Sequence, residues 1–172
     1  MLSKKMEEAL NKQINAELYS AYLYLSMCAF FESVELPGAA TWMKSQTQEE
    51  MSHAMKIYDF VNERGGRVKL EAISEPKVEW DSPLQAFEDA LMHEEYVTSL
   101  INGLMELAIS EKDHASQIFL QWFVTEQVEE EASANSVVQK MKLAGQSPGG
   151  LFMVDKELGT RPLMVSLPED KN

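Results

Sequence analysis

A glutamate and a histidine interrupt an otherwise apolar helical pattern in the stretch from Gln46 to His53, QTQEEMSH. Glu50 and His53 are three residues apart, so on a helix both side chains project from neighbouring positions on one face. A carboxylate and an imidazole at that spacing can bind one metal ion. Such pairs are also common by chance on solvated helix faces, so this pair alone does not establish a site.

Three further helical patterns carry the same kind of interruption. Steps of three and four residues along each pattern give an apolar stripe with a polar group near its middle. The interrupting residues are Glu17 in the first pattern, Glu50 and His53 in the second, Glu94 in the third, and Gln127 with Glu130 in the fourth. The middle of a helix stays at one height whichever way the helix runs, so we expect these side chains to meet in one layer.

Four carboxylates buried together need neutralisation. Each unpaired buried charge is strongly unfavourable, and like charges repel one another. Either protons or metal ions must therefore accompany them, and four negative charges match two divalent cations. The oxygen-rich set with one imidazole favours iron or manganese. The alternative is an ordinary helical bundle whose carboxyl groups are protonated and bind no metal.

Four long helices are expected to position these residues. Their predicted ranges are 3–33, 38–64, 83–111 and 114–142. Ser3 can cap the first helix, and Ser82 followed by Pro83 opens the third. A fifth short helix is predicted at about 150–159.

The loop lengths determine the topology. Short loops make the first and second helices antiparallel, and likewise the third and fourth. The 18 residues from Gly65 to Ser82 can extend to about 60 Å, whereas a helix such as 38–64 is only about 40 Å long. This segment can therefore cross the bundle and make helices two and three parallel, with the strand-like alternation of RVKLEAI packed outside. The prediction is an all-α four-helix bundle with one long crossover.

Composition limits the class of protein and its partners. A chain of 172 residues is expected to form one domain. The net charge of -13 argues against nucleic acid and anionic membrane surfaces as partners. Cys28 is the only cysteine, which excludes an internal disulfide and suggests a reducing, cytoplasmic location. The longest apolar stretch, Ala21 to Phe31, is too short to span a bilayer, and the N-terminus lacks a secretory signal pattern.

The segments NAELYSAYLYLS, QEEMSHAMKIYDFVNERGG, ALMHEE and FLQWFVTEQVEEEASA resemble ferritins, specifically the non-haem microbial ferritins. The resemblance extends from about residue 5 to residue 160 and implies a ferritin-like diiron domain at 1–160, followed by a polar tail at 161–172. It also implies a homo-oligomeric shell of 24 subunits. Such a shell oxidises Fe(II) with O₂ or peroxide at each bundle centre and stores the product as ferric mineral. Helical bundles with one long crossover and a carboxylate diiron core are typical of this class.

The resemblance also assigns a dinuclear iron site residue by residue. The matching positions are Glu17, Glu50 and His53 for the first iron, and Glu94 and Glu130 for the second, with Gln127 beside them. Glu50 would bridge the two ions. The amide of Gln127 would hold a bound oxygen species or water by hydrogen bonding.

Four more positions match accessory features of microbial ferritins. Glu49, Glu126 and Glu129 match a third iron site that shares Glu130, although a solvated charge run is the simpler reading of QVEEE. Tyr24 matches a redox-active tyrosine beside the site, and a packing role in the core is its alternative.

Departures from related families narrow this assignment. The general diiron template has two Glu-x-x-His motifs, whereas Gln127 to Glu130 stands here in place of the second. The single cysteine excludes a rubredoxin-type iron domain. Met51 follows Glu50, but the rest of the bacterioferritin haem pattern is missing, so no haem is expected.

Several other residues carry weaker signals. The positions that line acidic three-fold channels in animal ferritins are Gln117 and Leu120 here, which leaves the iron entry route open, with Glu111 and Asp113 as nearby candidates. The remaining histidines, His93 and His114, are expected to be surface or capping groups. Packing roles are expected for Trp42, Trp80 and Trp122.

Besides the metal-free helical bundle, three functions remain open once the resemblance is taken together with the residues. The first is an iron-storage ferroxidase, and the second is a passive metal buffer with slow oxidation. The third is a diiron oxidase that acts on an organic substrate, which would need a pocket beside the metals that the apolar stripes do not indicate.

Overall fold

The chain forms a bundle of long helices. The computed structural model describes residues 2–145 and 147–162. The helices in these residues are α1 (Lys4–Ser33), α2 (Pro37–Glu63), α3 (Pro83–Ser110), α4 (His114–Ala144) and α5 (Pro148–Leu158). The predicted all-α bundle with a short fifth helix is confirmed, and predicted helix ends differ from observed ones by at most two residues. Within these described ranges, no helix has the length and apolar character needed to cross a membrane.

Polar side chains and a glycine define the helix ends. The Ser3 hydroxyl accepts a hydrogen bond of 3.0 Å from a backbone N–H in the first turn of α1. Ser82 does the same for α3 at 3.1 Å, and Asp113 for α4 at 3.2 Å. These caps satisfy N–H groups that have no partner within their helices. Gly145 ends α4 with a φ of +57°, a conformation that favours glycine.

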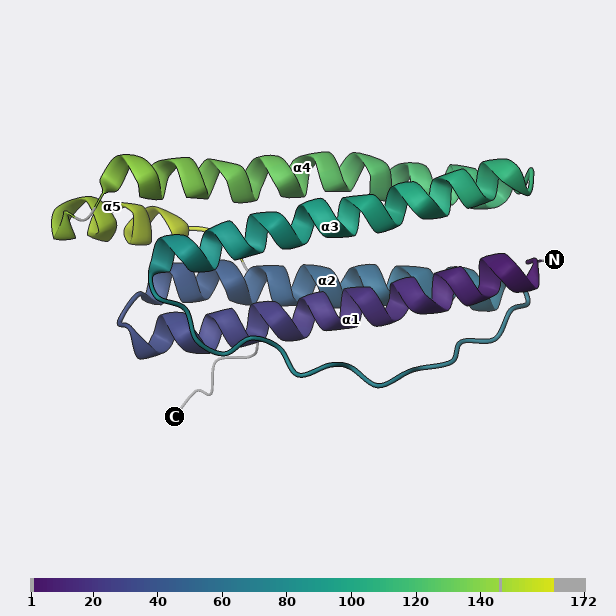
Figure 1. The fold of residues 1–172 in the computed structure, drawn as a ribbon, viewed down its shortest axis with the longest axis horizontal. Coiled ribbons are helices and arrows are strands. Elements are labelled where there is room, and N and C mark those ends of the chain that lie inside the picture. The colour runs from purple at the N-terminus through teal and green to yellow at the C-terminus, as the bar shows by residue number, and fades with distance from the viewer. Residues whose placement is uncertain (1, 146, 163–172) are drawn as a thin grey trace.

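The segment 65–82 connects α2 to α3 along the outer side of α1 (Figure 1). It makes α2 and α3 parallel, as predicted, and has no regular secondary structure. Backbone carbonyls of this segment accept hydrogen bonds from polar side chains of α1, where a β-strand would be bonded to a neighbouring strand. Asn11 donates to the Arg67 carbonyl at 3.0 Å, Asn15 to the Ala72 carbonyl at 3.2 Å, and Ser26 to the Lys77 carbonyl at 2.7 Å.

Buried apolar side chains form two separate clusters along the bundle. On α1 one cluster ends at Ile14 and the other begins at Leu23. On α2 the clusters are separated in the same way, between Met43 and Ile57. The residues between the clusters include the polar groups that interrupt each stripe. The long helices therefore place a polar layer between two apolar regions.

Helix α5 packs against α2 and α4 at one end of the bundle (Figure 1). The Ala39 N–H at the start of α2 donates a hydrogen bond of 2.8 Å to the Asp155 carboxylate of α5. A Cβ atom on Gly38 would lie 1.7 Å from the Asp155 carbonyl oxygen. The close approach of these two helices therefore requires glycine at position 38.

Candidate metal centre

Helices α1 and α2 bring together a first group of metal-binding side chains. Glu17 is 1% exposed, and Glu50 and His53 are each 2% exposed. One potential ligand atom from each of the three lies within 4.8 Å of the others. His53 Nδ1 lies 3.4 Å from Glu50 Oε2. The i, i+3 spacing in α2 therefore aims both side chains at Glu17, as the sequence predicts.

One carboxylate oxygen of Glu17 accepts a hydrogen bond, and the other accepts none from the described residues. Gln13, one turn earlier in α1, donates a hydrogen bond of 3.0 Å to Glu17 Oε1. Glu17 Oε2 is buried and has no hydrogen-bond partner among the described residues. Buried polar atoms are rarely left without a partner. A carboxylate oxygen in this position, beside a second carboxylate and an imidazole, fits a bound cation.

His53 also belongs to a second group of potential ligands, with Glu126 and Glu130 of α4. His53 Nε2 lies 4.0 Å from Glu126 Oε1, on the opposite side of the ring from Glu50. The Gln46 side-chain amide donates a hydrogen bond of 2.7 Å to Glu130 Oε2. The imidazole thus lies between the carboxylates of α2 and those of α4.

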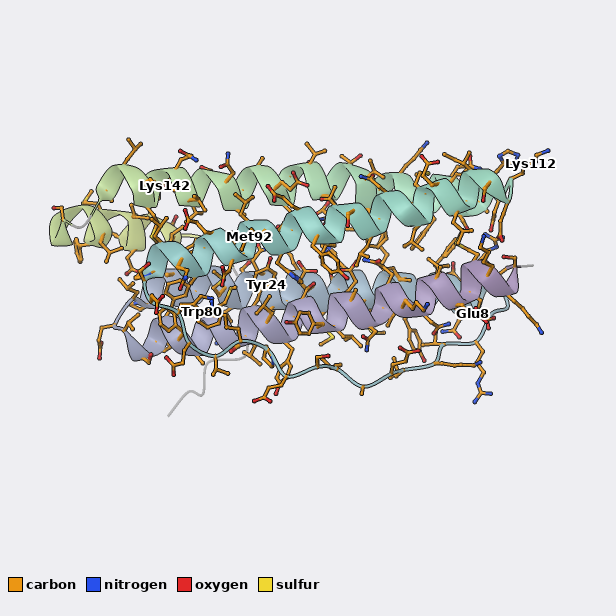
Figure 2. The ribbon with its side chains drawn as sticks, in the orientation of Figure 1. Glu8, Tyr24, Trp80, Met92, Lys112 and Lys142 are labelled. Atoms are coloured by element: carbon orange, nitrogen blue, oxygen red, sulfur yellow. The ribbon has the colours of Figure 1, made fainter. Side chains whose placement is uncertain are left out.

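Glu94 of α3 is held by protein donors. The Tyr24 hydroxyl donates a hydrogen bond to Glu94 Oε1, and Gln127 Nε2 donates one of 3.2 Å to Glu94 Oε2. Figure 2 shows Tyr24 at the seam between α1 and α3. Within the described part of the chain, Glu94 joins neither group of three potential ligands. Its charge still acts on Glu130, and its sharing of one metal with Glu130 stays a prediction.

Burial makes the carboxyl groups of this layer weak acids. It raises the pKa of Glu17 from 4.5 to about 7, and the hydrogen bond from Gln13 offsets part of the rise. Burial and the charge of Glu94 raise the pKa of Glu130 from 4.5 to about 8. The pKa of Glu50 is raised by burial and by its carboxylate neighbours, and that of Glu94 by burial. Without a cation, the layer would therefore retain protons near neutral pH.

His53 is held in the form that binds metals. Burial, with the nearby charge of Lys56, lowers its pKa from 6.5 to about 4, so the imidazole is neutral at pH 7. Trp122 packs its ring edge against the imidazole with 5.3 Å between ring centres. The other two tryptophans pack in the core as expected, Trp42 on Phe87 and Trp80 on Phe30.

The predicted third iron site is only partly assembled. Glu49 and Glu126 are half-buried, whereas Glu129 is exposed. Burial raises the pKa of Glu126, and the charges of Glu129 and Glu49 add to the effect, so the three groups interact electrostatically. Glu49 itself forms an ion pair of 2.6 Å with Arg161.

One sequence expectation about the histidines is wrong. His93 was expected at the surface or as a capping group, but its Nε2 lies 2.7 Å from the buried Ser20 hydroxyl. Its ring lies against the rings of Tyr19 and Tyr24, and burial lowers its pKa from 6.5 to about 4. Its partners come from α1, which local spacing in α3 does not reveal. His114 is exposed at the start of α4, as expected.

Three polar residues of this region had no predicted role. Gln13 and Gln46 donate to the layer carboxylates Glu17 and Glu130. Gln13 lies four residues before Glu17, so the i, i+4 rule offered a signal for that contact. Arg161 follows α5 and reaches Glu49 from a distant part of the chain. No local pattern indicates that contact.

Comparison with known proteins identifies close relatives. A family model described as the ferritin-like domain matches residues 7–144. The bacterial non-heme ferritin of Bacteroides fragilis is 46% identical over 161 residues, which are 94% of this chain and 100% of that protein. That of Staphylococcus aureus is 40% identical, covering 94% of this chain and 97% of that protein. An open pore ferritin from the hyperthermophilic archaeon Archaeoglobus fulgidus is 58% identical, with a TM-score of 0.93 and coverage of 94% and 100%.

Proposed function

The chain belongs to the ferritin family of iron-storage proteins, and from this premise we propose that it is a ferroxidase as well as a store. Fe(II) is the substrate, and the buried polar layer is the place where it is oxidised. The ferric product is then kept as mineral inside a shell made of copies of this chain.

The observation that carries this proposal is the group formed by Glu17, Glu50 and His53. Three potential ligand atoms lie within 4.8 Å of one another, almost fully buried, and one carboxylate oxygen of Glu17 has no other partner. Charged groups are kept in such surroundings when a cation neutralises them. This donor set of oxygens and one imidazole suits Fe(II).

We assign a second Fe(II) to Glu94 and Glu130, with Glu50 bridging the two ions. Each Fe(II) gives up one electron, so a pair supplies the two electrons that reduce O₂, with two protons, to H₂O₂. With peroxide as the oxidant, the same pair of electrons and two protons break the O–O bond to give two water molecules. Carboxylates favour the ferric products because a hard anionic oxygen stabilises the higher charge.

The neighbouring side chains would orient this chemistry. Gln127 and Tyr24 both donate to Glu94, so they keep that carboxylate near the layer until an ion binds. Tyr24 is buried beside the layer, where it can supply one further electron to the oxidant while its hydroxyl proton passes to the Glu94 carboxylate that accepts its hydrogen bond. The outer set of Glu49, Glu126 and Glu129, with Glu130, would hold a third ion.

Stopped-flow absorbance after Fe(II) is mixed with aerated protein tests the ferroxidase activity. The parent is expected to show a fast ferric phase that Glu50→Ala lacks. Glu106→Ala, which removes an exposed carboxylate of α3, should retain this phase. A parent phase no faster than that of Glu50→Ala would favour a passive metal buffer instead.

Two further measurements test the metal site and the shell. Anomalous scattering at the iron edge from Fe(II)-soaked crystals should show ions in the layer, and an empty layer would favour a bundle with protonated carboxyl groups. Light scattering should give about 470 kDa for 24 copies of a 19.5 kDa chain. A cytoplasmic location is part of the same proposal.

A further inference from the structure

Arg161 lies along α2 although it follows α5 in the chain. Its Nη2 atom lies 2.6 Å from Glu49 Oε2, and its Cζ atom lies 4.7 Å from the centre of the Trp42 ring. The next residue, Pro162, accepts a hydrogen bond of 3.2 Å from the Ser45 hydroxyl through its carbonyl. Trp42, Ser45 and Glu49 are spaced by three and four residues, so they share one face of α2. This face binds both the side chain and the backbone of the segment after α5.

The guanidinium group of Arg161 is only partly satisfied by these contacts. Its Nη1 atom is buried and has no hydrogen-bond partner among the described residues. An arginine side chain has five N–H donors, and burial of an unpaired donor is unfavourable. The ion pair with Glu49 must therefore offset this cost, since the side chain could otherwise extend into solvent.

The charge of Arg161 also acts on a second carboxylate. Burial raises the pKa of Glu130, and the nearby positive charge of Arg161 offsets part of that rise. One positive charge thus serves both Glu49 and Glu130. These are two of the four carboxylates that the proposed third iron site would use.

We propose that Arg161 is the resident cation of this outer carboxylate site and that a metal ion binds to Glu49 only when Arg161 leaves. The inference rests on the proposed function in one respect, that Glu49 and Glu130 belong to a metal-binding set. A guanidinium 2.6 Å from a carboxylate oxygen blocks that oxygen from a metal ion, and the two positive charges would repel each other.

Two consequences follow for the order of metal binding. The inner group of Glu17, Glu50 and His53 has no ion pair with Arg161, so its affinity should not depend on this residue. The outer site should bind its ion more weakly than the same carboxylates would alone. Metal binding and docking of Arg161 on α2 should oppose each other, and such coupling is reciprocal.

Isothermal titration of the assembled protein with Zn(II), which does not change its oxidation state, tests the inference. Arg161→Gln should bind the outermost Zn(II) about tenfold more tightly than the parent, with binding at the inner group of Glu17, Glu50 and His53 unchanged. Lys140→Gln is the matched control, because it removes the ion pair of 2.5 Å with Glu157 of α5 and leaves Glu49 untouched. It should give the parent isotherm.

Arg161→Lys separates charge from packing. It keeps the positive charge but loses the planar guanidinium group with its paired N–H donors. Because the charge is what opposes the metal ion, this variant should bind the outer Zn(II) as weakly as the parent. The inference is overturned if Arg161→Gln matches the parent, or if Arg161→Lys gains as much affinity as Arg161→Gln. If only these outer-site results fail while the parent still binds Zn(II) at the inner group, the proposed function stands. If no variant and no parent binds Zn(II), both are wrong.

Discussion

Metal binding to the buried layer should release protons, because its carboxyl groups are weak acids when no cation is present. The pKa of Glu17 is raised to about 7 and that of Glu130 to about 8, chiefly by burial. At pH 6.0 these two groups would together hold almost two protons per subunit, and at pH 8.0 fewer than one. A bound cation ionises both groups. Their contribution to proton release should therefore fall by roughly one proton per subunit between the two pH values.

Titration with Zn(II) in buffers of different ionisation enthalpy measures this release directly. Glu50 and Glu94, whose pKa values are also raised, add to the release. The number of protons that they release cannot grow as the pH rises, because a carboxyl group holds fewer protons at higher pH. Glu17→Gln should lower the release at pH 6.0 by roughly one proton. Glu106→Gln, at an exposed position of α3, should leave it unchanged.

Two results would refute this reasoning. A release close to zero at pH 6.0 would mean that the carboxyl groups are already ionised before a cation binds. Equal release at pH 6.0 and pH 8.0 would mean that no group of the layer titrates in this range. The first result would mean that burial had not raised these pKa values, and the case for a cation in the layer would lose its electrostatic basis. The second would mean that the pKa values of Glu17 and Glu130 lie outside this range.

Three further predictions concern stability and rate. The pKa of Glu17 is raised from 4.5 to about 7 in the folded protein, so its ionisation destabilises the metal-free protein increasingly between pH 4.5 and 7, fully above pH 7, and not below pH 4.5. Glu17→Gln should therefore stabilise the metal-free protein by about 3 kcal/mol at pH 8, measured by denaturant unfolding. Gly38→Ala places a Cβ atom 1.7 Å from the Asp155 carbonyl oxygen, so it should displace α5 and lower stability by about 2 kcal/mol or more in thermal unfolding. Tyr24→Phe removes a donor to the α3 carboxylate, so it should slow Fe(II) oxidation in stopped-flow measurements and leave the Zn(II) stoichiometry unchanged.

Each of these has an outcome that contradicts it. A stability difference for Glu17→Gln that does not change with pH would rule out a raised pKa. Gly103→Ala is the control for Gly38→Ala, because a Cβ atom there meets nothing within 4 Å, and it should stabilise α3 by up to about 1 kcal/mol. Equal effects of the two alanines would rule out a close helix contact. Unchanged oxidation in Tyr24→Phe would leave Tyr24 with a packing role only.

The fold could be predicted from the sequence because its signals are local. Apolar stripes at helical spacing, caps such as Ser3 and Ser82, and the length of segment 65–82 together define the helices and the crossover. The height of the polar layer follows from the same stripes. Which side chains pair within the layer depends instead on how each helix is rotated about its axis.

Contacts between helices show this limit. His93 reaches Ser20, and Glu94 accepts hydrogen bonds from Tyr24 and Gln127. No spacing within α3 distinguishes these partners from others at the same height. The contacts of the predicted tail at 161–172 likewise cannot be read from local spacing. Arg161 folds back onto α2, and residues 163–172 lie outside the described part of the chain.

The separation of the apolar side chains into two clusters has a consequence for how ions come and go. Each long helix is fixed near both ends by close apolar contacts, whereas its central turns carry the side chains that would rearrange if an ion binds to the layer. Rotation of Glu94 or withdrawal of Gln127 therefore leaves the tightly packed ends undisturbed. Repeated binding and release of metal ions would break and re-form hydrogen bonds in the polar layer. The close-packed apolar contacts, which resist rearrangement, would stay intact through every cycle.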